Sequence, residues 1–150
     1  MRLNHSKRAG VTVVESAVVY PIVFLLVVGL IVGSWGVFRY QELASLARRA
    51  SRWASVHGTQ YAFDTKRPAA TPQDIYDNAI APYAIGFDTS RLTYSVTWNT
   101  DNAPYHTVDV NGSVTASRNI VTVTINYQWL PEAFLGQIQL SSTSNMPMCY

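Results

Sequence analysis

One acidic residue, Glu15, stands in an otherwise apolar stretch, shortly after a Gly10–Val11 junction that follows Lys7 and Arg8. A carboxylate within a bilayer is costly, by up to about 3 kcal/mol, so it needs a partner of opposite charge. A cut after Gly10 would give Val11 a free α-amino group, and that amine on a neighbouring subunit could pair with Glu15. Alternatively, Glu15 reaches the membrane surface beside Lys7 and Arg8, or favours the start of the helix. The residues alone leave both interpretations open.

No other residues form a catalytic or metal-binding pattern. The three histidines, His5, His57 and His106, are scattered and lack the spacing of metal ligands. The sequence contains no nucleophile elbow, P-loop or dinucleotide-binding glycine motif. We therefore expect no enzymatic activity, no cofactor and no metal site. The single cysteine, Cys149, allows no internal disulfide.

The element that would position Glu15 is an uncharged segment from Ala17 to Phe38. As a helix it would be roughly 33 Å long, close to the ~30 Å hydrocarbon core of a bilayer. Its apolar core is longer than that of a secretory signal peptide, and no good cleavage site follows it. The sequence predicts a basic leader-like segment at residues 1–10 and a transmembrane helix at residues 11–38.

Two further features of this segment concern its packing and orientation. Gly29 and Gly33 form a G-x-x-x-G pair, which permits close helix–helix approach or merely reflects small residues in a span. Basic residues flank the segment on both sides, which favours membrane surfaces over nucleic acid as their surroundings. Long polar domains translocate largely regardless of charge, so we expect the N-terminus in the cytoplasm.

Beyond the span, residues 39–57 predict an amphipathic extension of the same helix that ends at Gly58. Its apolar side chains recur at three- and four-residue steps, and Arg48, Arg49 and Arg52 fall largely off this stripe. The stripe consists of Leu43, Leu46, Ala47, Ala50, Trp53, Ala54 and His57.

Residues 58–150 predict an extracytoplasmic α+β domain. Residues 59–70 suggest a loop, and Thr71 with Asp74 predicts the capped start of a short helix that ends by Gly86. Alternating apolar residues predict strands at 92–98 and 121–129, with a third at 137–143. Asn111-Gly112 signals a hairpin turn. The predicted fold is α+β and pilin-like: a long N-terminal transmembrane helix that continues as an amphipathic helix, packed on a small antiparallel sheet.

A basic pair, a glycine, four residues, a glutamate and then a long apolar helix resemble the precursors of type IV pilin-like proteins. Residues 8–21 are more closely similar to the N-terminus of TadE-like proteins, which belong to tight-adherence (Tad/Flp) pilus systems. The Ala- and Arg-rich segment at 44–52 extends the similarity. So do the strand-like segment at 121–129, Pro131 and residues 140–144.

The resemblance implies that a prepilin peptidase cuts after Gly10 and that Glu15 aids assembly. Two departures qualify it: Ala9 separates the basic pair from Gly10, and Ser16 follows Glu15 where the major Flp pilins have an aromatic residue. The second departure points to a minor subunit.

We therefore expect a TadE-like minor pseudopilin that assists assembly of a Tad adhesion pilus or related secretion machinery. It would reside in the bacterial inner membrane as a single-pass protein. Its expected partners are membrane lipid, other pilin-like or Tad-system proteins and a prepilin peptidase, with no nucleic acid. The alternative is a single-pass membrane protein, unrelated to pili, whose extracytoplasmic domain binds a ligand or an envelope component.

Processing after Gly10 makes a direct prediction about the mature chain. In cells with an active prepilin peptidase, mass spectrometry of the purified protein should find Val11 at the N-terminus. The same cells without the peptidase should yield the chain from Met1. A chain that begins at Met1 in both strains would contradict processing.

Overall fold

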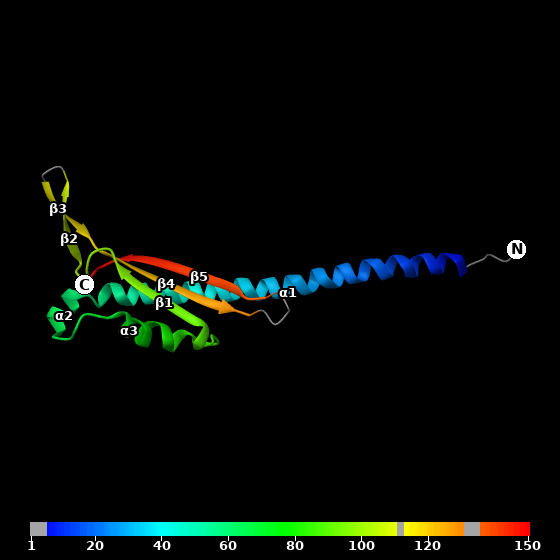
Figure 1. The fold of residues 1–150 in the computed structure, drawn as a ribbon, viewed down its shortest axis with the longest axis horizontal. Helices are drawn as coiled ribbons and strands as arrows, with labels where there is room; N and C mark the ends of the chain where they lie inside the picture. The colour runs from blue at the N-terminus through cyan, green and yellow to red at the C-terminus, as the bar shows by residue number, and fades with distance from the viewer. Residues whose placement is uncertain (1–5, 111–112, 131–135) are drawn as a thin grey trace. The chain divides into compact units, whose positions relative to one another are not determined.

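The computed structural model describes residues 6–110, 113–130 and 136–150 (Figure 1). Contacts within the chain divide it into two units, of which the first ends at Phe38 and the second begins at Arg39. The elements are the helices α1 (Ser6–Val56), α2 (Thr59–Thr65) and α3 (Pro72–Ile75) and the strands β1 (Leu92–Trp98), β2 (Tyr105–Val110), β3 (Ser113–Arg118), β4 (Ile120–Trp129) and β5 (Ile138–Pro147). The predicted α+β class is confirmed.

The described residues of the first unit, 6–38, form the first part of α1. The helix has 51 residues and continues through Pro21. Its apolar side chains are uncovered: Val13, Leu25 and Leu30 are 67, 68 and 63% exposed. In the part of the chain that the structure describes, α1 is the one helix long and apolar enough to cross a membrane. The predicted long N-terminal helix is therefore confirmed, and it fits a single-pass membrane protein.

The second unit begins with the remainder of α1, and the predicted apolar stripe is its buried face. Leu43, Ala47 and Ala50 are completely buried, and they share one core cluster with Val123 and Ile125 of β4. The exposed residues Arg48, Arg49 and Arg52 lie off this face, as predicted. Small alanine side chains let a helix approach a sheet closely, because they add little bulk between the two backbones.

A three-stranded antiparallel sheet with the order β1-β4-β5 covers this face of the helix. In β4, buried and partly exposed residues alternate from Val121 to Tyr127, which confirms the predicted period of two. β5 is longer than the predicted strand at 137–143 and extends to Pro147. Its inward positions include Ser142 and Ser144, so polar residues hid the alternation in the sequence.

Strands β2 and β3 form a separate two-stranded antiparallel sheet, with Val110 opposite Ser113. This pairing agrees with the hairpin predicted between them. The turn residues Asn111-Gly112 themselves lie outside the described residues.

For the segment between α1 and β1, one prediction is wrong and one is confirmed. Residues 59–70 are not entirely a loop, because Thr59–Thr65 form α2, a short helix with no buried residue and therefore no apolar stripe to reveal it. The capping box is present: the Asp74 N–H donates to Thr71 Oγ1 at 3.2 Å, and the Thr71 N–H donates to Asp74 Oδ2 at 2.9 Å. The side-chain and backbone hydrogen bonds from Thr71 lower the pKa of the Asp74 carboxyl.

The helix that starts at this cap changes character after one turn. A π-helical turn over Tyr76–Ile80 and a 3₁₀ turn over Ala81–Tyr83 replace the predicted regular helix. Pro82 lacks the N–H that a continuing α-helix would need, which disfavours a regular helix through this segment.

Two distant segments, one at Asn102 and one at the C-terminus, contact the chain at Gly58. Its N–H donates to Tyr150 O at 3.0 Å, and the next N–H, that of Thr59, donates to Asn102 O at 2.9 Å. A Cβ atom built at Gly58 would lie 2.5 Å from Asn102 O and 2.6 Å from Met148 Cε, with Tyr150 O also too close. The absence of a side chain is thus what lets the C-terminal residues reach the end of α1.

We predict that Gly58→Ala destabilises the second unit by about 1–3 kcal/mol, because the added methyl group overpacks this junction. The measurement is denaturant unfolding of the full chain in detergent, followed by near-UV circular dichroism. Gly33→Ala is the matched control, since a Cβ there meets no atom within 4 Å. Equal stability of the two variants would contradict the prediction.

Candidate functional site

The first candidate residue, Glu15, is exposed on α1 among exposed valines that include Val14 and Val18. Within the described ranges, the ion pairs do not involve Glu15. The Gly10–Val11 junction lies in the same helix, near its start. A carboxylate in this position can accept hydrogen bonds or form an ion pair with a basic group of its own chain or of another molecule.

The second candidate feature is a shallow apolar groove on the same helix. Gly29 and Gly33 leave open space, because a Cβ built on either one meets nothing within 4 Å. The nearby Ser34 hydroxyl donates to Leu30 O at 2.7 Å, so its polar group is already satisfied within the helix. The groove is lined by Leu26, Gly29, Leu30, Gly33, Ser34 and Val37.

These sequence-predicted residues are not gathered into one site. Glu15 and Gly29 are separated by about 21 Å along the helix, given a rise of 1.5 Å per residue. The helix therefore presents a polar contact near one end of the span and a close-packing face nearer the other. Such an arrangement can bind a partner helix along its length, but it cannot perform joint chemistry on one substrate.

In the second unit, the arginines of α1 line a groove against β5. Arg48 and Arg52, one helical turn apart, share it with Arg49, whose guanidinium carbon lies 3.8 Å from the centroid of the Tyr83 ring. The groove wall is held by a hydrogen bond of 2.8 Å between the hydroxyls of Ser51 and Ser144. The lining residues are Ser45, Arg48, Arg49, Arg52, Ser144, Asn145 and Met146, which include no acidic side chain. The groove is thus suited to an anionic group.

The sequence indicated that these arginines are exposed, but it did not reveal the groove. Its other wall comes from β5, whose register against β4 places Ser144 opposite Val123. The only signal in the sequence was the i, i+4 spacing of Arg48 and Arg52, which places both on one side of a helix.

A run of aromatic rings joins the end of α1 to the C-terminus. Trp53 stacks on His57 with centroids 3.9 Å apart, His57 contacts Tyr61 at 4.6 Å, and Tyr61 meets Tyr150 edge-on at 6.4 Å. The Tyr150 hydroxyl donates to Asp64 Oδ2, and this bond raises the pKa of Tyr150. The sequence did not reveal this cluster, because its last member is more than 80 residues from the others.

The described residues contain no group of three His, Cys, Asp or Glu side chains that could hold a metal ion. Cys149 is a free, exposed cysteine. The candidate features are surfaces that other molecules can contact. They are the apolar helix with Glu15, the groove at Gly29 and Gly33, and the groove lined by Arg48, Arg49 and Arg52.

Comparison with known proteins identifies one family. Residues 10–52 match the family model described as TadE-like protein. Neither the curated proteins nor the solved structures contain a match to this chain. The family match begins at Gly10, includes Glu15 and the Gly29–Gly33 pair, and ends at Arg52. The resemblance predicted from the sequence is thus confirmed over this part of the chain, and the sheets lie outside it.

Proposed function

From the TadE-like match at residues 10–52, we propose that this chain is a pseudopilin-type minor subunit that assists assembly of a Tad pilus or related secretion machinery. The observation that carries the proposal is the position of Glu15. It is an exposed carboxylate on an uncovered apolar helix, within the segment that matches the family. The chain would cross the bacterial inner membrane once, with its N-terminus in the cytoplasm and residues 58–150 outside.

In this proposal a prepilin peptidase cuts after Gly10, and Val11 becomes the new N-terminus. The α-amino group of Val11 on one subunit then pairs with Glu15 of a neighbouring pilin-like subunit. The pair neutralises a carboxylate that is otherwise costly to hold in the membrane. Assembly is favoured because the isolated subunit cannot satisfy this charge within its own apolar surroundings.

The Gly29–Gly33 groove would act at a different depth of the same helix. Helices in a bilayer associate by close van der Waals packing, and small residues allow their backbones to approach. The arginine-lined groove of the second unit would add a contact to an acidic segment of another Tad-system protein. Its three arginines are exposed residues, and no carboxylate is among the residues that line the groove.

We predict that Glu15→Gln weakens association with pilin-like partners roughly tenfold, because a polar contact between membrane helices contributes about 1–2 kcal/mol. Co-purification from cells that contain the assembly system measures the loss. The matched control is Glu42→Gln, which alters the other carboxylate of α1. Glu42 lies in the second unit and already pairs with Arg39 at 3.1 Å.

The two variants separate the candidate functions. If Glu15→Gln associates and supports assembly as well as the natural chain does, the pilus role is contradicted. The alternative is then favoured, namely a single-pass protein whose outer domain binds a ligand or envelope component.

Filling the small-residue groove provides an independent prediction. Gly33→Leu should reduce association of the span with its partner helices severalfold, because a bulky side chain keeps the backbones apart. A Cβ at this position meets nothing within 4 Å, so the added side chain begins in open space. Cross-linking in native membranes measures the effect, with Val28→Leu on the opposite side of the helix as control. A Gly33→Leu chain that cross-links as well as the control would refute a packing role.

A further inference from the structure

A short loop of the second unit lies against the first charged residue that follows the span. This loop comprises residues 84–86, and Gly86 adopts a φ of +81°. A Cβ atom built at Gly86 would lie 3.1 Å from Arg39 Nη1. The Arg39 guanidinium carbon is also 5.4 Å from the centroid of the Phe87 ring. The 84–86 loop is therefore held next to Arg39.

The residue at the centre of this loop is apolar and uncovered. Ile85 is 80% exposed, and among the described large apolar side chains of the second unit only Phe63 is exposed to the same extent. Tyr83, just before the loop, is 47% exposed and has Arg49 over its ring. An exposed aliphatic side chain with a tyrosine and two arginines close by is the residue mixture found at membrane–water interfaces.

Several contacts fix the conformation of the loop, so the exposure of Ile85 is part of the fold. On one side, the Phe87 N–H donates to Ala84 O at 3.1 Å. The Phe87 ring meets the ring of Tyr127 on β4 edge-on, with centroids 4.8 Å apart.

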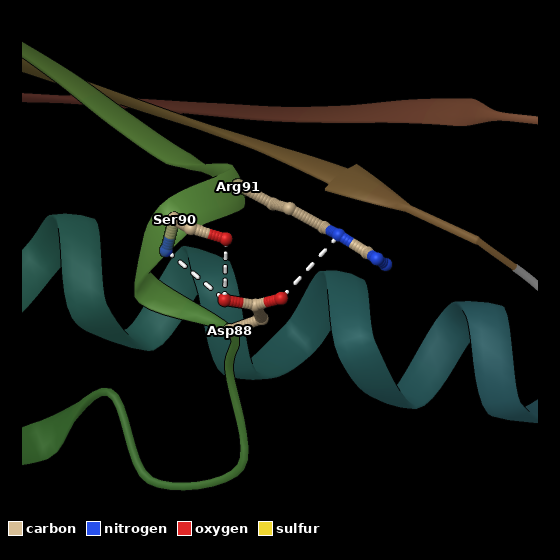
Figure 2. Close-up of polar contacts among 3 residues, drawn as sticks. All are labelled: Asp88, Ser90 and Arg91. Carbon is tan, nitrogen blue, oxygen red and sulfur yellow. Dashed lines mark hydrogen bonds and ion pairs between the residues drawn. The ribbon is translucent and has the colours of Figure 1, made fainter.

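On the other side, Asp88 accepts hydrogen bonds from the Ser90 N–H at 3.1 Å and the Ser90 hydroxyl at 2.7 Å, and it pairs with Arg91 at 3.4 Å (Figure 2). The bonds from Ser90, together with the charge of Arg91, lower the pKa of the Asp88 carboxyl. Asp88 therefore remains ionised at neutral pH, and the cap after the loop persists.

The position of Arg39 in the sequence indicates which surroundings the 84–86 loop would have. Arg39 is bonded to Phe38, the last residue of the uncharged segment, so on the proposed single-pass anchoring it lies where the chain leaves the bilayer. We propose that the 84–86 loop is a second membrane contact, in which Ile85 enters the lipid interface beside the exit of the span. Together with the anchor, this contact would fix how the second unit stands on the bilayer, and hence which surfaces face neighbouring subunits.

The chain offers a closely matched comparison for testing this inference. Phe63 on α2 is 81% exposed, almost as much as Ile85, but it follows the far end of α1. The part of α1 between Arg39 and Val56 is about 26 Å long. Phe63 therefore represents an equally exposed apolar side chain that is remote from the exit of the span.

The experiment uses the full chain with Cys149→Ser, which removes the only cysteine. Ile85→Cys, Phe63→Cys and Leu25→Cys are each labelled with an environment-sensitive fluorophore. The labelled proteins are reconstituted into phosphatidylcholine–phosphatidylglycerol vesicles, with and without lipids that carry a quenching nitroxide. We expect the Ile85 and Leu25 probes to shift to the blue and lose most of their fluorescence to the quencher. The Phe63 probe should keep its fluorescence.

Two results would overturn the inference, and they differ in whether the proposed membrane span remains supported. If the Leu25 probe is quenched while the Ile85 probe behaves like the Phe63 probe, the anchor remains and the second contact is refuted. If the Leu25 probe is not quenched, the span itself is refuted, and the proposed function fails together with the second contact.

Discussion

The constraint on which the rest of the structure depends is the uncovered apolar surface of the first part of α1. Side chains such as Val13, Leu25 and Leu30 are exposed over most of their area, and burying apolar surface away from water is worth about 25 cal/mol per Å². Among the described residues of the first unit, 6–38, nothing covers them, because these residues form a single helix. A lipid bilayer and neighbouring helices satisfy this requirement, and a soluble monomer does not. The roles proposed for Glu15 and for the Gly29–Gly33 pair both depend on an apolar environment around this helix.

At Arg39 the side-chain pattern of α1 changes from a largely apolar surface to one that is apolar on a single face. The rest of the second unit packs against that face. Beyond that residue, alanines and leucines occupy one face only, with Ala47 and Ala50 completely buried against the core that includes β4. The other face carries arginines, which remain in water. One continuous helix therefore has two kinds of surface: its first part is apolar and uncovered and fits a membrane span, and its second part belongs to a folded domain. In the proposed single-pass arrangement, the residues near Arg39 belong to the folded domain and lie where that domain adjoins the membrane.

How much could be predicted from the sequence depended on how far apart the interacting residues are. The Thr71–Asp74 capping box was predictable because both partners lie within one turn, and the alternation in β4 was predictable because each strand residue signals its own face. β5 was predicted too short, since Ser142 and Ser144 occupy inward positions that the pattern assigns to apolar residues. α2 was missed because a helix without a buried face has no periodic signal. The arginine-lined groove and the exposure of Ile85 depend on contacts between distant segments, which no local pattern encodes.

The free-energy cost of holding the Glu15 carboxylate in a membrane depends on whether residues 1–10 are still attached. Before any cut, Lys7 and Arg8 lie about two helical turns away in the sequence, so the leader itself supplies positive charge near the carboxylate. Removing residues 1–10 would take both charges away and leave one α-amino group, at Val11. In the proposed mechanism the carboxylate then satisfies its charge through the amine of a neighbour, and a precursor with its leader has less to gain from that pairing. Processing and assembly would thus be coupled by the electrostatics of one side chain, because residues 11–38 contain no basic side chain that could pair with Glu15 after the cut.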